Sequence, residues 1–362
     1  MFIITWILRV VGMVLPKADG TCSSTTDPVW VVGYFSQATG LGEGARLYYR
    51  EVKESGRKVF AIDISKSSGK AAVDEMFQGL LFTPRNCPAQ NEAGTIVFHV
   101  NPPHIMAALW RCRELVRNKR RVAYWAWELE EIPPFWVPCL SHFDAIECPS
   151  VFTADAIRRK TRKPISVHPP RILERTPSQR NFAEDGKMRV LSIFDLASNI
   201  SRKNPIAAIK AFQSAFGNSE KVELILKTNL SAHCLKEFNI IQESIGRSGN
   251  IQIMARQLTR EELEGLYCRS DVYISLHCSE GYGLTIREAM EFGLEVVATG
   301  WSGNMDFMQG PKCHAVPYSF VQVYDAKLNV FSHMKKQQWA KADVAQAAEI
   351  LRSIADFRKW SY

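Results

Sequence analysis

Short apolar runs alternate with longer amphipathic segments from Val29 almost to the end of the chain. Short runs rich in β-branched and aromatic residues are typical of buried strands, and apolar residues three or four apart are typical of helices that cover them. This alternation predicts an α/β architecture with parallel sheets. The predicted strands are 30–35, 58–64, 95–100, 121–127, 145–148, 165–167, 188–194, 222–227, 251–255, 271–276 and 295–299. The predicted helices are 42–54, 105–117, 150–159, 205–216, 259–270, 285–292 and 343–354.

One polar stretch interrupts the alternation. Residues 168–187 (HPPRILERTPSQRNFAEDGK) are rich in proline and charge, which is typical of a linker. A chain of 362 residues is long enough for two domains of ordinary size. The boundaries predicted from this pattern are an apolar leader and linker over 1–28, a first domain over 29–170, a linker over 171–187 and a second domain over 188–362.

Composition excludes some classes of protein. With 46% hydrophobic and 23% charged residues the chain is globular, and its net charge of +8 favours either plain solubility or attraction to phosphates, an acidic glycan or an anionic membrane. It has no nucleic-acid recognition motif and no dense basic-aromatic tract. Nine scattered cysteines without a Cys-x-x-Cys pair argue against a disulfide framework or structural zinc. We expect buried thiols, such as Cys139 and Cys268, and a reducing cytoplasm.

The first 15 residues (MFIITWILRVVGMVL) form an apolar run that is too short for the roughly 20 residues of a membrane span. Arg9 interrupts the run, whereas a signal peptide carries its charge ahead of it. Three interpretations stay open: a membrane-surface helix, a buried leader or an early start codon. The first would hold a cytoplasmic protein at the inner face of the membrane.

Residues 279–288 (SEGYGLTIRE) place two carboxylates around a glycine turn between a predicted strand and a predicted helix. The first N–H groups of a helix lack intrahelical partners, so this turn is suited to bind an anion. Glu280 precedes the helix and Glu288 lies about one turn inside it. One carboxylate could therefore face a sugar and the other a ribose, with phosphates between them. The alternative is an ordinary strand–turn–helix with two solvated glutamates.

This segment resembles the Glu-x7-Glu signature of the family 4 glycosyltransferases, which are retaining enzymes of the GT-B fold. The resemblance continues through 296–306 (VVATGWSGNMD) and covers most of residues 29–356. It implies an α/β GT-B fold, with two facing Rossmann-like domains and a ligand cleft between them. The first domain would bind the acceptor and the second the nucleotide sugar. Family members usually continue past the helix 343–354, so we expect a shortened closing segment.

The resemblance also implies roles in the second domain. Glu280 would hold sugar hydroxyls and Glu288 the ribose. Arg202 and Lys203 occupy the place of a basic pair on the donor diphosphate, because preorganised cations stabilise the leaving phosphate. Lys227 would be a further donor contact. The turn at 256–258, after the next predicted strand, would face the base of the nucleotide. The residues that would cradle the phosphates are Gly281, Tyr282, Gly283, Leu284 and Thr285. A solvated basic loop and a surface lysine are the alternatives for the cations.

In the first domain the resemblance places the turn with Gly40 and Gly42 in the cleft, near the phosphate and the acceptor. Taken alone, that glycine pattern also fits a dinucleotide fold. Glu128 stands where many members carry a histidine, and it would orient sugar hydroxyls or stabilise a cationic sugar. His104 would lie at the edge of the cleft. A surface carboxylate and a structural histidine are the corresponding alternatives.

The chain has no Asp-x-Asp triplet. Together with the basic pair this predicts metal-independent transfer, no metal site and no resident cofactor. The predicted reaction moves a hexose, guessed as mannose from GDP-mannose, to a hydroxyl of a glycan or lipid-linked glycan, as in bacterial polysaccharide or lipopolysaccharide synthesis. Retention would follow from front-face attack. The alternatives are a nucleotide-sugar epimerase or phosphorylase on the same fold, and a non-catalytic partner that binds nucleotide sugar or glycan.

Overall fold

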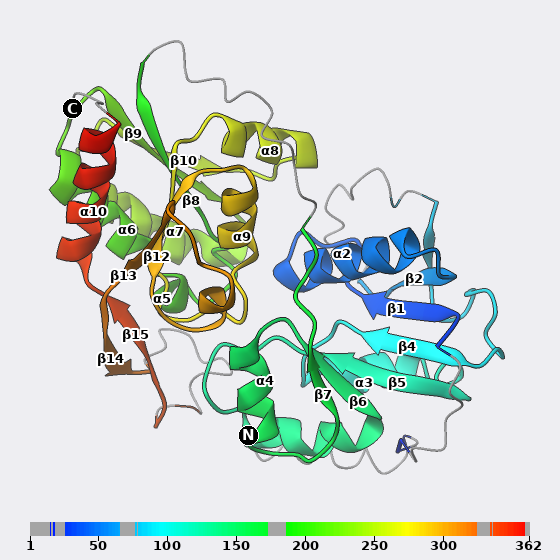
Figure 1. The fold of residues 1–362 in the computed structure, drawn as a ribbon. Helices are drawn as coiled ribbons and strands as arrows, with labels where there is room; N and C mark the ends of the chain where they lie inside the picture. The colour runs from blue at the N-terminus through cyan, green and yellow to red at the C-terminus, as the bar shows by residue number, and fades with distance from the viewer. Residues whose placement is uncertain are drawn as a thin grey trace. The chain divides into compact units, whose positions relative to one another are not determined.

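The computed structural model describes residues 15, 17–18, 26–65, 77, 79–172, 186–323, 334 and 336–358. The chain divides into two compact units, Met1–Arg171 and Ile172–Tyr362 (Figure 1). Most of the predicted leader (1–28) and of the predicted linker (171–187) lies outside the described residues. Among the described residues, no helix combines the length and the apolar character that crossing a membrane requires.

In the described part of the first unit, seven parallel strands form a sheet in the order β3-β2-β1-β4-β5-β6-β7. The strands are β1 (Val29–Gly33), β2 (Val59–Asp63), β3 (Leu81–Phe82), β4 (Gly94–Phe98), β5 (Lys119–Tyr124), β6 (Ala145–Cys148) and β7 (Ile165–Val167). The helical segments are α2 (Gly40–Glu54), α3 (His104–Arg111), the 3-10 helix η2 (Pro134–His142) and α4 (Val151–Arg158). The strand order reverses between β1 and β4, so the loops that follow these two strands diverge at the carboxyl edge, where such sheets bind ligands.

The second unit, as far as it is described, has a six-stranded parallel sheet in the order β10-β9-β8-β11-β12-β13 and a two-stranded antiparallel hairpin. The strands are β8 (Met188–Ile193), β9 (Val222–Thr228), β10 (Ile251–Ala255), β11 (Val272–Ser275), β12 (Glu295–Thr299), β13 (Cys313–Val316), β14 (Tyr318–Gln322) and β15 (Gln338–Ala342). The helical segments are α5 (Ile200–Lys203), α6 (Pro205–Phe216), η3 (Ala232–Cys234), α7 (Leu235–Ile245), α8 (Arg260–Cys268), α9 (Leu284–Glu291), η4 (Gly303–Asp306) and α10 (Val344–Phe357).

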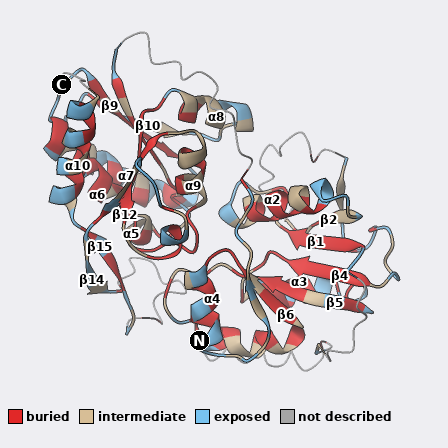
Figure 2. Ribbon diagram, in the orientation of Figure 1, coloured by how far each residue is buried: buried red, intermediate tan, exposed pale blue. Residues whose placement is uncertain are grey.

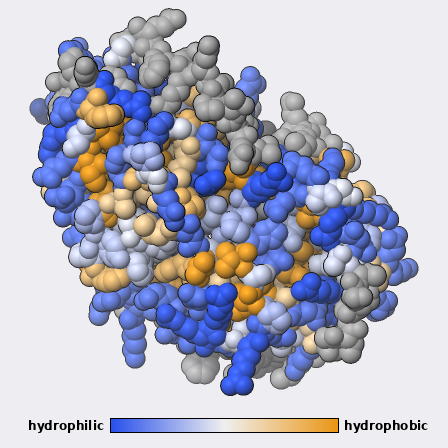
Figure 3. Space-filling model, in the orientation of Figure 1, coloured by the Kyte–Doolittle hydropathy of each residue, from blue (hydrophilic) through white to orange (hydrophobic). Residues whose placement is uncertain are grey.

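Both sheets have buried strands, and the helices carry the exposed residues on their outer faces (Figure 2). In the second unit, alternate strand residues enter two separate cores because successive side chains point to opposite faces. Val190 and Ile274 pack with α6 and α10, whereas Leu191 and Tyr273 pack on the side of α8 and α9. On the face in view, hydrophilic residues predominate and the hydrophobic ones gather in separate areas (Figure 3).

His168, just after β7, joins three elements of the first unit. Its Nδ1 lies 3.1 Å from Oε2 of Glu147 in β6, and its Nε2 lies 3.1 Å from both carboxylate oxygens of Glu51 in α2. Burial alone would lower the pKa of the ring, but hydrogen bonds and negative charge from the two carboxylates raise it to about 9. The imidazolium therefore ties α2 to the sheet by charge as well as by packing.

The predicted alternation is confirmed, but several predicted ends are shifted, including two in the first unit. The helix expected over 105–117 ends at Arg111, and the following residues bury Leu115 through turns instead. The strand expected over 121–127 ends at Tyr124. Beyond it the Asn101 side chain donates to the carbonyl of Ala126 (2.6 Å) and accepts from its N–H (3.2 Å), which replaces the pairing of another strand.

The cysteine prediction is confirmed in part. The eight cysteines among the described residues are free, and Cys139 is buried as expected. Cys268, expected to be buried, is only half-buried, because it ends α8 and the apolar run before it does not enclose its side chain.

Candidate functional site

The carboxyl edge of the second sheet brings together segments that are far apart in sequence. Strands β8, β11 and β12 are neighbours in the sheet and run parallel. Each is followed by one of the predicted site segments: α5 follows β8, the Glu280 loop follows β11, and residues 300–306 follow β12. Because parallel strands end at a common edge, the three segments converge there.

Three residues form the centre of this site, and we call Arg202, Lys203 and Glu280 the Glu280 cluster. Nζ of Lys203 lies 2.5 Å from Oε1 of Glu280, and Nη1 of Arg202 lies 3.3 Å from Oε2. The Arg202 guanidinium is almost fully buried and also donates to the carbonyl of Ser279 (2.7 Å) and to Oγ of Ser198 (3.2 Å). Arg202 therefore positions the loop, whereas Lys203 is the more exposed cation.

Glu280 is ionised in this setting. It is 9% exposed, and burial alone would raise its pKa, but the positive charges of Lys203 and Arg202 outweigh burial and hold it well below its usual range. The N–H of Glu280 donates to Oγ of Ser302 (2.8 Å), and its carbonyl accepts from the N–H of Gly303 (2.9 Å). A fixed carboxylate of this kind can accept hydrogen bonds from sugar hydroxyls.

The backbone around Glu280 is held from two further sides. The N–H of Cys278 donates to the carbonyl of Arg202 (2.7 Å), and the N–H of Ala340 in β15 donates to the carbonyl of Cys278 (2.9 Å). A Cβ at Gly303 would lie 2.3 Å from the carbonyl oxygen of Gly281, so only glycine allows this close approach. The Glu280 loop is therefore a rigid support.

The predicted phosphate turn leads directly into a helix. Gly283 adopts a left-handed conformation (φ 97°) and forms the N-cap of α9, which begins at Leu284. Helix geometry leaves the first N–H groups of α9 without intrahelical acceptors, so they suit an anionic ligand. The Thr285 hydroxyl accepts a hydrogen bond from Tyr273 (2.6 Å), which fixes the first turn. Tyr282 is buried against Phe307.

Glu288 lies about one turn into α9 as predicted, and its carboxylate is held by two partners. Arg260 Nη1 donates to Oε1 (2.8 Å) and the Tyr267 hydroxyl to Oε2 (2.9 Å). Both partners come from α8, which starts with a capping box between Thr259 and Glu262. Glu288 is thus a buried and oriented hydrogen-bond acceptor rather than a solvated carboxylate.

Lys227 is buried near the end of β9 rather than lying on the surface. Its Nζ donates to the carbonyl of Thr228 (2.8 Å) and to Oδ1 of Asn229 (3.0 Å). Burial and the charge of Arg256 lower the pKa of Lys227 to about 8. A lysine held this way gains from a nearby anion, because an anion restores the stability of its charged form.

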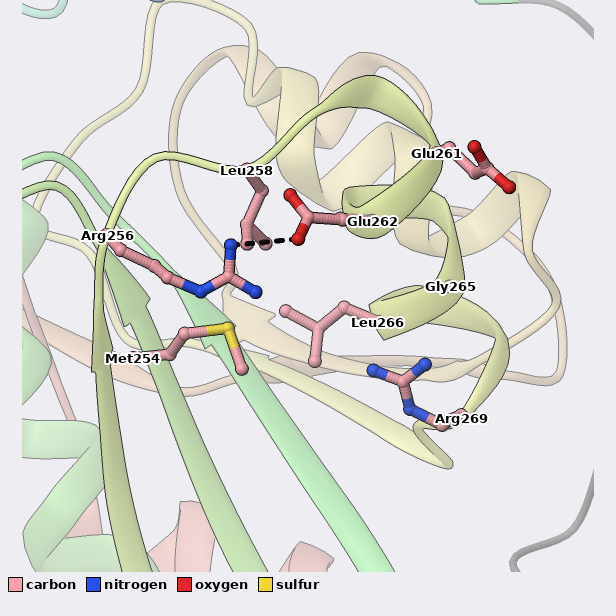
Figure 4. A pocket seen from close by; sticks show the side chains of 8 residues that line it. All are labelled: Met254, Arg256, Leu258, Glu261, Glu262, Gly265, Leu266 and Arg269. Atoms are coloured by element: carbon pink, nitrogen blue, oxygen red, sulfur yellow. Dashed lines mark hydrogen bonds and ion pairs between the residues drawn. The ribbon is translucent and has the colours of Figure 1, made fainter.

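A cavity of about 460 Å³ lies between β10 and α8 and shares no residue with the Glu280 cluster. In Figure 4 Arg256 is directed toward Glu262, with which it forms an ion pair of 2.9 Å, and Glu261 points away. The cavity includes two residues of the predicted base-facing turn, 256–258. Its lining residues are Met254, Arg256, Leu258, Glu261, Glu262, Gly265, Leu266 and Arg269.

The predicted residues of the first unit lie at the carboxyl edge of its sheet. Gly40 begins α2, and the N–H of Gly42 donates to Oγ1 of its cap Thr39 (3.2 Å). His104 is exposed at the start of α3, and Glu128 is half-buried in the loop after β5. Since β1, β4 and β5 are neighbours, the structure brings these residues to one edge, in a unit separate from the Glu280 cluster.

Three residues that build the site were not singled out in the sequence. Oγ of Ser302 accepts a hydrogen bond from the N–H of Glu280, and Arg260 and Tyr267 donate hydrogen bonds to the Glu288 carboxylate. Ser302 lies in the small-residue loop of the family resemblance, which was a usable signal. No sequence signal pointed to Arg260 and Tyr267, because only the packing of α8 against α9 brings them to the Glu288 carboxylate.

A family model described as "Family 4 Glycosyltransferase in conflict systems" matches residues 152–360. No curated protein sequence matches the chain. Among solved structures, the HepE protein of Anabaena, in complex with UDP and glucose, has a TM-score of 0.63 at 11% identity, over 92% of this chain and 91% of its own. An α,α-trehalose 6-phosphate synthase from Burkholderia multivorans has a TM-score of 0.58 at 12% identity, over 90% of each chain.

A third similar structure is larger. The pneumococcal O-GlcNAc transferase GtfA, in complex with UDP and GlcNAc, has a TM-score of 0.50 at 13% identity. The match covers 74% of this chain and 51% of GtfA, so this chain spans about half the length of that protein. At these identities structural likeness identifies the fold alone. That fold is GT-B, with two Rossmann-like α/β domains, as the sequence predicted.

Proposed function

Because the chain belongs to the family 4 glycosyltransferases in conflict systems, we propose that it moves a hexose from a nucleotide-diphosphate sugar to a hydroxyl of a glycan. The observation that carries this proposal is the Glu280 cluster beside the start of α9. There a cation, a fixed carboxylate and free helix N–H groups meet at the carboxyl edge of a parallel sheet.

The cations would act on the leaving group. When the bond between the sugar C1 and the phosphate oxygen breaks, negative charge grows on the diphosphate. Lys203 and the N–H groups of α9 stabilise that charge more than they stabilise the intact donor, which lowers the barrier. Lys227 adds a further positive charge. No resident cofactor and no metal ion take part in this proposal, since side-chain cations and backbone N–H groups carry out the charge stabilisation.

The two carboxylates would orient the donor. Glu280 accepts hydrogen bonds from hydroxyls of the transferred sugar, and Glu288 accepts them from the ribose. The acceptor oxygen attacks C1 on the face that the phosphate leaves, and its proton passes to the departing phosphate oxygen. The anomeric configuration is thereby retained. On the first unit, Glu128, His104 and the turn with Gly40 and Gly42 serve the acceptor side.

The donor expected from the sequence is GDP-mannose, and UDP-sugars are the rival class because HepE and GtfA were solved with UDP. The acceptor would be a glycan or lipid-linked glycan of bacterial polysaccharide or lipopolysaccharide type. A cytoplasmic enzyme held at the inner membrane face by residues 1–15 suits such an acceptor. Flotation with anionic liposomes, with and without residues 1–15, tests that contact.

The decisive experiment is calorimetric titration of the purified chain with UDP, GDP and ADP in EDTA. We expect one nucleotide to bind selectively and Lys203→Ala to abolish the signal. Lys236→Ala, at an exposed position in α7, serves as the matched control. Absence of binding by a folded sample would overturn the proposal. Product analysis by NMR with the bound nucleotide's sugar then separates transfer with retention from epimerisation, phosphorolysis and binding without turnover.

A further inference from the structure

Beside the Glu280 cluster lies a group of aromatic side chains to which the proposed donor contacts assign no role. Trp301 and Phe320 meet edge to face, with ring centroids 4.7 Å apart at 86°. Tyr318 completes the group at 5.6 Å from Trp301 and 5.3 Å from Phe320. Phe320 is 45% exposed although it is a large apolar residue. We call these three residues the aromatic platform.

The platform is fixed to the Glu280 loop at two points. Trp301 immediately precedes Ser302, whose Oγ accepts a hydrogen bond from the N–H of Glu280. Phe320 pairs in the hairpin with Ala340, whose N–H donates to the carbonyl of Cys278. Both contacts lie within two residues of Glu280 along the chain. The platform therefore keeps a constant position relative to the predicted sugar-binding carboxylate.

The hairpin face that carries the platform also carries amides. Alternate residues of a strand share one face, so Tyr318, Phe320 and Gln322 point the same way. Gln322 pairs with Gln338 across the hairpin, and paired residues of antiparallel strands lie on the same face. Both glutamines are exposed. One surface thus offers aromatic rings and, at its far end, two amide side chains.

We propose that the aromatic platform, with Gln322 and Gln338, binds a pyranose ring of the acceptor glycan. The proposal rests on the proposed function, since only a transferase needs an acceptor near Glu280. A pyranose has one face of C–H groups, which fits the electron-rich face of an aromatic ring, and a rim of hydroxyls, which amides recognise through both donor and acceptor atoms. A lipid chain or an apolar protein helix would gain nothing from the paired amides.

The test is saturation-transfer NMR with maltotriose, cellotriose, α-mannotriose and chitotriose as probes on the full chain. We expect at least one trisaccharide to bind, with roughly tenfold weaker affinity for Phe320→Ala, since losing one stacked ring changes binding on that scale. Phe320→Tyr should restore binding because it keeps the ring. Phe357→Ala, which removes an 87% exposed ring from α10, should leave it unchanged.

The outcomes separate this proposal from the proposed function. If trisaccharide binding depends on Phe320 but no nucleotide binds, the platform stands and the donor assignment falls. If no probe binds in a Phe320-dependent way, the platform assignment falls while nucleotide binding is unaffected. If Phe320→Ala loses both nucleotide binding and trisaccharide binding, the platform only supports the structure, and the proposal is overturned. Phe320-dependent flotation with liposomes overturns it in favour of a membrane contact.

Discussion

Nζ of Lys203 lies 2.5 Å from Oε1 of Glu280, although 77 positions of sequence separate the two residues. The ion pair joins the loop after β8 to the loop after β11. In the proposed function, a donor diphosphate that approaches Lys203 would therefore meet a cation already oriented by a carboxylate. The position of the ammonium is set before binding, which lowers the entropic cost of holding a ligand there.

The strength of this ion pair can be measured by a double-mutant cycle. Lys203→Met and Glu280→Gln should show a coupling of about 1–3 kcal/mol in the free energy of unfolding, because the pair is largely shielded from water. The pKa of Glu280 is lower in the folded than in the unfolded state, so this stability is present at neutral pH and is lost as the pH falls below 4.5. Urea unfolding at several pH values measures both effects.

The exposed ion pair between Arg256 and Glu262 is the control for this cycle. Its coupling should be smaller and should vanish in high salt, because exposed charges are screened. Equal coupling for the two pairs would show that the Glu280 cluster is no more than an ordinary surface contact.

The His168 bridge should make the stability of the protein fall in mildly alkaline solution. Because Glu147 and Glu51 raise its pKa to about 9, the stabilising charge is fully present below 6.5, the ordinary value, and is lost as the pH rises through 9. The imidazole resonance of His168, assigned by its loss in His168→Asn, should titrate near 9. The difference in unfolding midpoint between wild type and this variant should shrink from pH 6 to pH 10.

The exposed His233 provides the control for replacing a histidine by asparagine, because it lies outside the His168 bridge. A His168 resonance that titrates near 6.5 would contradict the bridge between the two carboxylates.

Glu288→Gln should weaken nucleotide binding by roughly tenfold to a hundredfold, because an amide accepts hydrogen bonds less strongly than a carboxylate and the change removes one of the two carboxylates that pair with Arg260. Calorimetry with the nucleotide that the wild type prefers gives this ratio. Glu243→Gln, at an exposed position in α7, should bind like the wild type. Unchanged affinity for Glu288→Gln would remove this carboxylate from the donor site.

Gly303→Ala should destabilise the protein by about 1–3 kcal/mol or more, because the new methyl group meets the carbonyl oxygen of Gly281 at 2.3 Å. The displaced loop should also lower nucleotide affinity. Gly249→Ala is the matched control, since nothing lies within 4 Å of the added methyl group. Chemical unfolding of both variants checks the difference, and equal stability would show that the two loops can separate freely.

The arrangement of strands was predictable because the central strands contain runs of apolar residues. Parallel strands buried on both faces need such runs, as in residues 224–226 and 296–298. Helix α7 and the hairpin of β14 and β15 were missed for the opposite reason. Helix α7 is mostly exposed, so it lacks a long apolar stripe. Strands β14 and β15, which contain Phe320 and Trp339, pair with each other and not with the main sheets.

The geometry of the candidate site was predictable where its residues lie in one local motif. Glu280, Gly283 and Glu288 share one short segment, so their spacing was visible. The partners of the carboxylates were not, because Arg260 and Ser302 reach them only through tertiary packing. The sequence also suggested two equivalent phosphate-binding cations. Packing separates them, since Arg202 is buried under the loop and Lys203 is the more exposed of the two.

The hydrogen bond from Ala340 to Cys278 bears on how the protein is made. During synthesis the loop with Glu280 leaves the ribosome well before β15 does, so for that interval it lacks one of its backbone partners. The loop gains this backbone partner only when the hairpin has been translated and has folded back. The proposed donor site would therefore be completed late in translation, and a nascent chain halted before Ala340 would lack this support of the Glu280 loop.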